Sequence, residues 1–533
     1  MFKKMPRMVC ALLTLAMLLA LAPASLGEAK GNALPLSTTG ETLTIYCAID
    51  GQQSAAMKDL SEHSVVKQIE EETGVTLKFV HPPLNDDGTF FNTTIASGEW
   101  PDLFYTDRFN YYPGGIEGAI EDRILMDIDD LVEQYAPNFN ALIATQGDNI
   151  QKMIRGDGGH ITKYGTMFLP PFVDRRVHNG LVVRKDWLEK YGLEAPVTLD
   201  EYTDVLRVFK DNGVEVPLAL PKFTDTQFNN TSPIATAFGV CYNDFVLDAD
   251  GKVHYSRTMD EYKEFLTFMN GWAQEGLIDR DLVSRTGTDA NTLFFNGRAG
   301  MTFFHNATTK TALAVGQQDD PAYDVLGLVY PRKNREDKLT LSRQAISVNS
   351  FSWVVSANCK NPELAIRFID YLHMEPTRLL TAWGCGSEAY PTYVENEDGT
   401  RTFTDFMNAN PDYDFTTCRS LYTLGVFQVM YDDMMERQQY NIPQNMQIWE
   451  AWATDNCMDS KVPSLITMTT DESREFTEIK SKMDNYADEM VYKFIFGDAP
   501  LDEFDGFVAQ LKTLGADRAC EIQQAAYDRF LAR

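Results

Sequence analysis

Residues 97–109, SGEWPDLFYTDRF, contain a short apolar run that ends in a charged pair. The run 103–105 (LFY) predicts a short buried strand, and Asp107 and Arg108 follow where that strand should end. Such a pair can bind a ligand, form a surface ion pair or take part in catalysis. Which of these roles it has depends on the fold that surrounds it.

The segments around this stretch alternate between strand and helix patterns. Residues 43–48 (LTIYCA) and 75–80 (VTLKFV) predict strands, and the helical pattern of 65–72 between them ends at Gly74. Together with the strand at 103–105, this β-α-β order predicts an α/β fold whose sheet is mostly parallel and covered by helices.

A second α/β section begins near Gly159. Thr198 and Glu201 have the spacing of a capping box, which predicts the start of a helix. Helical spacing of the apolar residues after Asp260 places Trp272 in the core. The tail, 470–533, has the pattern of amphipathic helices, and further strands are predicted at 181–183, 301–304 and 352–355.

The first residues predict export. Lys3, Lys4 and Arg7 precede an apolar run, 9–21, which is shorter than the roughly 20 residues that span a bilayer. Small residues follow, so we expect a signal peptide over 1–24, with cleavage as late as residue 29 as the alternative. Residues 25–40 are rich in small and polar residues and predict a flexible leader.

Composition excludes several functions. The formal net charge of −30 repels phosphate groups, so neither nucleic acid nor an anionic membrane is an expected partner. The eight cysteines are widely spaced and form no CxxC pair, and the seven histidines are scattered, so we expect neither a metal nor a cofactor. No GxSxG, HExxH or Walker pattern is present. The Asx-Gly motifs at 248–251 and 396–399 fit hairpin turns and lack the calcium ligands of an EF-hand.

Several blocks, in a consistent order, resemble one family. SGEWPDLFYTDRF, RKDWLEKYGLEAPVTLDEY, FFNGRAGMTFF and NPELAIRFIDYL are similar to segments of extracellular solute-binding proteins of ABC importers. The resemblance is to maltose-binding proteins and more closely to the large oligosaccharide-binding lipoproteins of Gram-positive bacteria. It covers about residues 41–533. Residues 22–31 contain no cysteine, so the lipid anchor of those relatives is doubtful here, and we expect an extracellular or cell-surface protein.

The resemblance implies a fold with two α/β lobes joined by a hinge of crossing strands, with ligand between the lobes. We expect lobe 1 over 41–160 and 350–410, and lobe 2 over 165–345 and 415–533. Each lobe is therefore discontinuous. The crossing strands are expected near 165–180 and 343–353.

The same resemblance implies a carbohydrate site. Open α/β sheets bind ligands at the carboxyl ends of their strands, where Asp107 and Arg108 of one lobe and His305 and Asn306 of the other are predicted to lie. Carboxylate and guanidinium groups suit sugar hydroxyls, and aromatic rings can stack on a pyranose. His305 and Asn306 can equally cap the helix that follows. The further candidates for ligand contacts are Trp100, Tyr105, Trp383 and Glu388.

These features together predict a monomeric binding protein, not an enzyme, that captures a carbohydrate, most simply an oligosaccharide, for a membrane permease. Three alternatives stay open. One is a binding protein for a peptide or a charged sugar, with Arg175, Arg176 and Arg343 as the candidate cations of its cleft. The second is a secreted glycoside-active enzyme with two carboxylates in the cleft. The third is a sensor that presents its ligand to a membrane receptor.

Overall fold

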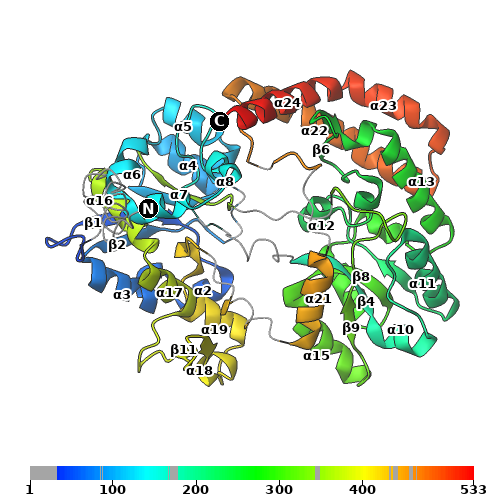
Figure 1. Ribbon diagram of the computed structural model, residues 1–533, viewed down its shortest axis with the longest axis horizontal. Coiled ribbons are helices and arrows are strands. Elements are labelled where there is room, and N and C mark those ends of the chain that lie inside the picture. The colour runs from blue at the N-terminus through cyan, green and yellow to red at the C-terminus, as the bar shows by residue number, and fades with distance from the viewer. Residues whose placement is uncertain are drawn as a thin grey trace, which may run out of the picture.

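The computed structural model describes residues 33–84, 86, 88–165, 167, 178–341, 348–430, 434–435, 438, 442–454, 460–463 and 465–533. The chain forms two lobes that lie side by side (Figure 1). The predicted signal peptide lies outside the described residues. Within them, no helix combines the length and the apolar character that a membrane crossing requires.

Lobe 1 is built on a four-stranded sheet in the order β10-β3-β1-β2. β1 is parallel to β2 and β3, whereas β10 is antiparallel to β3, so the predicted mostly parallel sheet is confirmed. The apolar strands pack between two layers, because helix α16 lies on one face and α4 and α5 on the other. The strands are β1 (Thr42–Cys47), β2 (Thr76–Val80), β3 (Leu103–Thr106) and β10 (Ser352–Val355).

The predicted end of the helix over 65–72 is confirmed. Helix α3 (Ser64–Thr73) ends at Gly74, whose φ of 67° is left-handed and whose added Cβ would lie 2.2 Å from the Ser37 carbonyl oxygen. A small hairpin, β11 (Tyr393–Glu395) and β12 (Arg401–Phe403), confirms the turn predicted at 396–399. The other helices are α2 (Gly51–Ala56), α4 (Thr89–Ser97), α5 (Gly115–Glu121), α6 (Asp129–Tyr135), α7 (Pro137–Ala144), α8 (Asp148–Met153), α16 (Pro362–Leu372), α17 (Glu375–Trp383), α18 (Asp405–Asn408) and α19 (Phe415–Tyr422).

Lobe 2 has a mixed sheet in the order β5-β8-β4-β9. Only β5 and β8 are parallel, and β4 is antiparallel to both of its neighbours. The strands are β4 (Asn179–Arg184), β5 (Val216–Ala219), β8 (Ala299–His305) and β9 (Val325–Gly327). A hairpin of β6 (Phe245–Leu247) and β7 (Val253–Tyr255) confirms the turn predicted at 248–251.

The predicted capping box opens helix α11, where Thr198 Oγ1 accepts from the Glu201 amide and Glu201 Oε2 accepts from the Thr198 amide. Trp272 is buried in the core of lobe 2, as predicted, and its indole nitrogen donates to Thr203 Oγ1 at 2.8 Å. The helices of lobe 2 are α10 (Lys185–Tyr191), α11 (Leu199–Asp211), α12 (Thr226–Thr231), α13 (Asp260–Gln274), α14 (Gly287–Phe295), α15 (Thr309–Asp319), α21 (Pro443–Ala453), α22 (Thr470–Phe496), α23 (Phe504–Thr513) and α24 (Ala516–Ala532).

Two predicted boundaries need correction. Residues 415–430 belong to lobe 1, not lobe 2, because Gln53 Nε2 donates to the Ser420 carbonyl at 3.0 Å and the Leu424 amide donates to the Thr381 carbonyl at 2.8 Å. The end of the predicted flexible leader is also packed, since Leu36 is buried and the Ser37 amide donates to the Thr73 carbonyl at 2.9 Å.

Within the described residues, the chain passes between the lobes between 167 and 178, between 341 and 348, and between 438 and 442, where Gln438 is still bonded to Phe403 of lobe 1. It returns to lobe 1 after Val462, since Leu465 packs on the lobe 1 core. On lobe 1 the ends of the first two passages lie side by side, next to Met430. Met167 forms isolated β-bridges with Val348 and Met430, and its amide donates to the Val429 carbonyl at 2.9 Å. The second passage therefore ends earlier than the predicted interval 343–353, because 352–355 is a strand of the lobe 1 sheet.

A further contact between the lobes is made by the last residues of helix α24. Helix α24 reaches back from lobe 2, so that the end of the chain lies on lobe 1 (Figure 1). There Arg529 Nε lies 2.6 Å from Asp157 Oδ2, and Arg533 Nε lies 3.0 Å from Asp157 Oδ1. Lys152 Nζ also donates to the Leu531 carbonyl at 2.8 Å.

Candidate functional site

The connectivity places one edge of each sheet toward the passages between the lobes. Residues 168–177 join Met167 at the carboxyl end of β3 to His178 at the start of β4, a span of at most roughly 40 Å. Asn179 of β4 pairs with His305, the last residue of β8. The carboxyl ends of β3 and β8 are therefore the sheet edges from which side chains can meet between the lobes.

On lobe 1 this edge carries the turn 107–111, which follows β3. Asp107 is the N-cap of a 3₁₀ turn, Arg108–Tyr111, and makes no capping bond with its side chain. Arg108 lies against the loop before α4, where its Nη2 donates to the Asp86 carbonyl at 2.8 Å. Asn110 Nδ2 donates to the Asp107 carbonyl at 2.8 Å, which closes the turn.

Lys163 reaches the same turn from the segment beside β10. Its side chain is 6% exposed, and its Nζ donates to Asn110 Oδ1 and, at 3.4 Å, to the Ser350 carbonyl. Burial lowers the pKa of Lys163 to about 8, although the charge of Asp107 acts in the opposite direction. The turn thus brings together an acid, two cations and an amide.

On lobe 2 the facing edge carries two histidines. The rings of His178 and His305 stack with centroids 5.2 Å apart and an angle of 4° between their planes. His305 Nδ1 accepts from the Ala307 amide at 3.1 Å, so the alternative that His305 caps the following turn is confirmed. Asn306 is fully buried, and its backbone amide donates to the His178 carbonyl at 2.7 Å.

The other predicted contact residues do not join this group. Trp100 precedes β3 at the opposite end of the strand, and its indole nitrogen donates to the Ile95 carbonyl at 3.0 Å. Tyr105 is buried on the core face of the sheet, with its ring 4.9 Å from that of Trp353. Trp383 is 0% exposed and its ring lies 4.6 Å from that of Phe403, so it belongs to a core and no ligand can reach it in this arrangement.

Glu388 is exposed on the segment between α17 and β11, and its role stays a prediction. Arg175, Arg176 and Arg343, the candidate cations for an anionic ligand, lie outside the described residues. Lys163, Asn110 and His178 were not predicted. Of these, only Asn110 had a signal in the sequence, because it lies three residues after Asp107 in the same turn.

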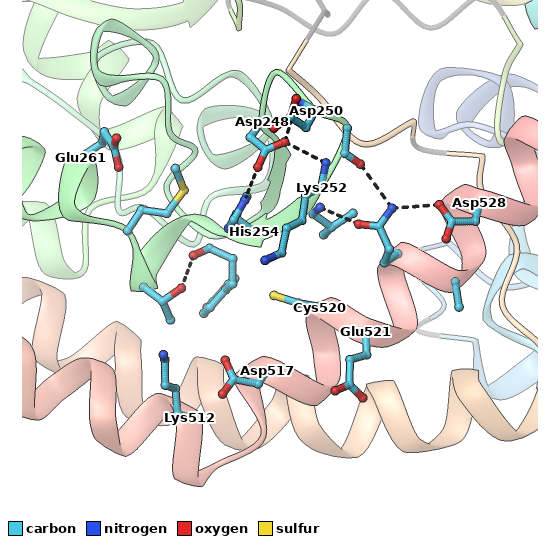
Figure 2. A pocket seen from close by; sticks show the side chains of 17 residues that line it. Asp248, Asp250, Lys252, His254, Glu261, Lys512, Asp517, Cys520, Glu521 and Asp528 are labelled. Atoms are coloured by element: carbon cyan, nitrogen blue, oxygen red, sulfur yellow. Dashed lines mark hydrogen bonds and ion pairs between the residues drawn. The ribbon is translucent and has the colours of Figure 1, made fainter.

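A second hollow lies on lobe 2, between the β6–β7 hairpin and α24 (Figure 2). It measures about 1070 Å³, and its lining includes the acidic residues Asp248, Asp250, Glu261, Asp517, Glu521 and Asp528. His254 Nε2 lies 2.8 Å from Asp248 Oδ2 within the hairpin. Gln524 of α24 accepts from the Val253 amide and donates to Asp528, which stabilises the hairpin on the helix.

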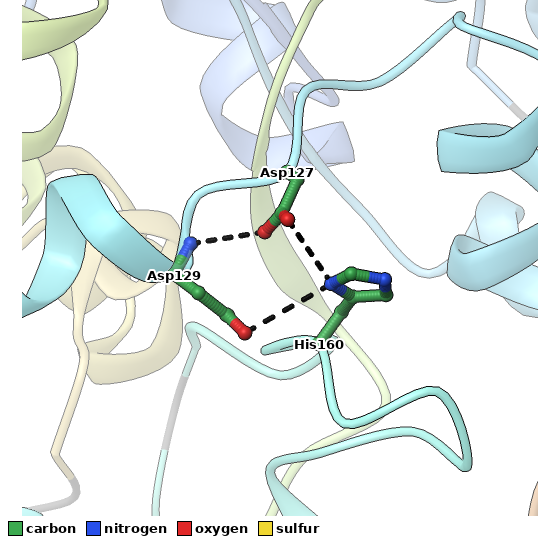
Figure 3. Close-up of side chains that lie close together, drawn as sticks. All are labelled: Asp127, Asp129 and His160. Atoms are coloured by element: carbon green, nitrogen blue, oxygen red, sulfur yellow. Dashed lines mark hydrogen bonds and ion pairs between the residues drawn. The ribbon is translucent and has the colours of Figure 1, made fainter.

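Asp127, Asp129 and His160 form the one group of potential metal ligands found among the described residues (Figure 3). His160 Nδ1 lies 3.2 Å from Asp127 Oδ2 and 3.9 Å from Asp129 Oδ2. Arg155 Nη1 also lies 3.2 Å from Asp129 Oδ2, and Asp129 Oδ1 accepts from the Ile161 amide. A guanidinium at this distance opposes a cation, so the group is best explained as bonds that hold the loop 155–161.

Comparison with known proteins agrees with this geometry. Residues 57–373, more than half of the chain, match the family described as "Bacterial extracellular solute-binding protein". The protein belongs to this family, whose members bind solutes and are not enzymes. Its two-lobed α/β architecture is the fold that the sequence predicted.

Among individual proteins, the chain is 22% identical over 500 residues to the "Fructooligosaccharide ABC transporter substrate-binding protein FusA" of Streptococcus pneumoniae, covering 89% of this chain and 88% of FusA. An "HMO binding ABC-transporter associated Solute Binding Protein" from Bifidobacterium longum infantis has a similar structure, with a TM-score of 0.75, 18% identity and coverage of 92% and 99%. The alginate-binding protein AlgQ2 superposes with a TM-score of 0.68, 20% identity and coverage of 93% and 100%.

Proposed function

We propose that this protein captures a carbohydrate, an oligosaccharide in the simplest case, between its two lobes and delivers it to the permease of an ABC importer. Membership of the solute-binding family supports the binding role. The names of FusA and of the Bifidobacterium protein, which bind fructooligosaccharides and HMOs, support the class of ligand and the ABC transporter. Export from the cell is part of the proposal.

The observation that carries the proposal is the pair of polar edges at the lobe passages. Asp107, Arg108 and Asn110 lie at the end of β3, and the stacked rings of His178 and His305 lie at the end of β8. A sugar hydroxyl donates and accepts hydrogen bonds, so it suits a carboxylate beside a guanidinium. The flat imidazole pair offers a surface for the apolar face of a pyranose.

Closure of the lobes would let one ligand touch both edges. Each lobe alone offers a few polar groups on an open surface, which gives weak binding. A ligand that bridges the two lobes binds the closed state more tightly than the open state. It therefore shifts the equilibrium toward the closed state by the difference between these two binding free energies. This hinge motion would let a permease distinguish the loaded protein from the empty one.

A thermal-shift screen of the exported chain tests the proposal, with mono- and oligosaccharides as ligands and peptides as controls. A ligand at 100 times its Kd stabilises the protein by about 2.7 kcal/mol, which raises the melting temperature measurably. We expect a shift with one class of glycan, lost in Asp107→Ala and Arg108→Ala. Glu99→Ala is the matched control, since Glu99 is an exposed acid at the other end of β3.

Other outcomes would overturn parts of the proposal. A shift with peptides alone would keep the fold and replace the ligand. No shift with any glycan would refute carbohydrate capture. A glycan shift that survives in both the Asp107→Ala and the Arg108→Ala variants would move the site away from the end of β3.

A further inference from the structure

One side chain at the proposed site is bonded to three separate segments of lobe 1. The two hydrogens of Asn110 Nδ2 go to the Asp107 carbonyl at 2.8 Å and to the Ser350 carbonyl at 3.0 Å. Its Oδ1 accepts from Lys163 Nζ. Lys163 Nζ also donates to the Ser350 carbonyl, so the three segments close into one network.

Two of these segments, those of Lys163 and Ser350, are the lobe 1 ends of the first two lobe passages and are called their starting points below. Lys163 lies four residues before Met167, after which the chain leaves for lobe 2. Ser350 lies two residues after Val348, where the chain has returned. Met167 and Val348 form a β-bridge with each other, so the two starting points are already adjacent.

We propose that Asn110, held by Lys163, is a positioning residue that couples the ligand-binding turn to the starting points of both lobe passages. The inference rests on the proposed function, because it assigns Asp107 and Arg108 to the ligand. Ligand contacts that order the turn 107–111 then order Lys163 and Ser350 through the same amide. In this way occupancy of the lobe 1 edge favours one relative arrangement of the lobes.

The burial of Lys163 supports this role. Lys163 precedes Tyr164, which forms a β-bridge with Trp353 of β10; the residue is 6% exposed, and its charged end reaches the turn. A buried ammonium requires acceptors, and Asn110 Oδ1 and the Ser350 carbonyl supply two of them. Displacing Asn110 would therefore disturb Lys163, so the turn and the segment 161–165 cannot rearrange independently.

Hydrogen exchange of the full chain without ligand tests the network directly. We expect Asn110→Ala to raise exchange about tenfold in all three segments, 107–111, 161–165 and 349–352, since local opening there becomes easier. Asn110→Asp keeps an acceptor for Lys163 but loses both Nδ2 donors, so exchange should rise at 107–111 and 349–352 and not at 161–165. Asn212→Ala, which removes one bond to the Val208 carbonyl at an exposed helix end, is the matched control and should act only locally.

Ligand binding supplies the second readout. With the glycan that shifts the wild-type protein, calorimetry should show Asn110→Ala and Lys163→Met binding about 5- to 20-fold more weakly, and X-ray scattering should show a smaller ligand-induced compaction. A variant with unchanged affinity and full compaction, or with faster exchange confined to 107–111, would overturn the coupling. If the wild-type protein binds no glycan, the proposed function fails, whereas the exchange of the unliganded protein still decides whether the network exists.

Discussion

The contact between α24 and lobe 1 gives a prediction whose magnitude can be worked out. Asp157 is 15% exposed and accepts from both Arg529 and Arg533, whose side chains are 30% and 7% exposed. Together the two arginines hold the pKa of Asp157 below its usual range, even though burial raises it. Glu472 lies 2.5 Å from Arg529 and keeps that cation paired when Asp157 is removed.

After Asp157→Ala, the remaining hydrogen-bond acceptors of Arg533 in the described structure are neutral: the carbonyls of Lys152 and Arg155 and the hydroxyl of Thr467. Removing one partner of a buried ion pair destabilises a protein by about 3 kcal/mol at the lower end of the measured range, which suits a partly exposed pair. Arg533→Ala should cost less, because Asp157 keeps Arg529.

The assay is differential scanning calorimetry of the full chain. The entropy of unfolding is roughly 2.1 cal/mol/K per residue, or about 1 kcal/mol/K for a chain of about 500 residues. A loss of about 3 kcal/mol then lowers the melting temperature by about 3 °C if the lobes unfold together, and by about 6 °C if one lobe of half that size unfolds alone.

Asp412→Ala, which removes an exposed acid from lobe 1, is the control and should melt within about 1 °C of the wild-type protein. The double variant Asp157→Ala/Arg533→Ala should be less destabilised than the sum of the single variants, because the two side chains interact. An Asp157→Ala variant that melts like the control, or strictly additive effects, would refute the reasoning.

Three further predictions follow from burial. Trp383→Ala should destabilise lobe 1 by about 3–5 kcal/mol in chemical denaturation, because a fully buried indole is removed; a loss below about 1 kcal/mol would contradict its place in the core. Burial lowers the pKa of His63 and His373 to about 4, so as the pH falls the unfolded chain takes up protons on these histidines before the folded protein does. The free energy of unfolding should therefore decrease between about pH 6.5 and pH 4, and His373→Gln should weaken this pH dependence. A melting temperature that stays constant over this window would argue against the prediction. Burial also raises the pKa of the Cys47 thiol to about 12, so at pH 8 Cys47 should react with a disulfide reagent such as DTNB only after unfolding, as read by mass spectrometry of the labelled peptides.

Local sequence signals were sufficient for the elements that have a clear periodicity, cap or turn motif. Gly74 ends α3 because a left-handed C-cap favours glycine, and the Thr198–Glu201 box starts α11 because it satisfies the free amides of a helix start. The free cysteines agree with the wide spacing of the thiols: Cys47, Cys241, Cys359, Cys385, Cys418 and Cys520 are unpaired, and Cys457 lies outside the described residues.

The candidate site could be predicted only in part. Asp107 and Arg108 lie at the carboxyl end of β3, as expected, because the end of a strand is visible in the sequence. Trp100 was predicted to join Asp107 and Arg108 because it is close to them in sequence. It precedes β3, however, whereas Asp107 and Arg108 follow it, so the length of the strand lies between them. Trp383 has an indole that suits either a ligand or a core, and only its neighbours Phe403 and Tyr393 decide between the two.

The sequence by itself determined the family, several strands and helices of each lobe, and the strand end that carries the charged pair, since these depend on periodicity and on residues adjacent in the chain. Tertiary structure alone decided that 415–430 packs on lobe 1, that Lys163 and Ser350 meet Asn110, and that Arg533 reaches Asp157. Each of these contacts joins residues far apart in the chain. Their partners are set by how the lobes pack, and no local pattern records that.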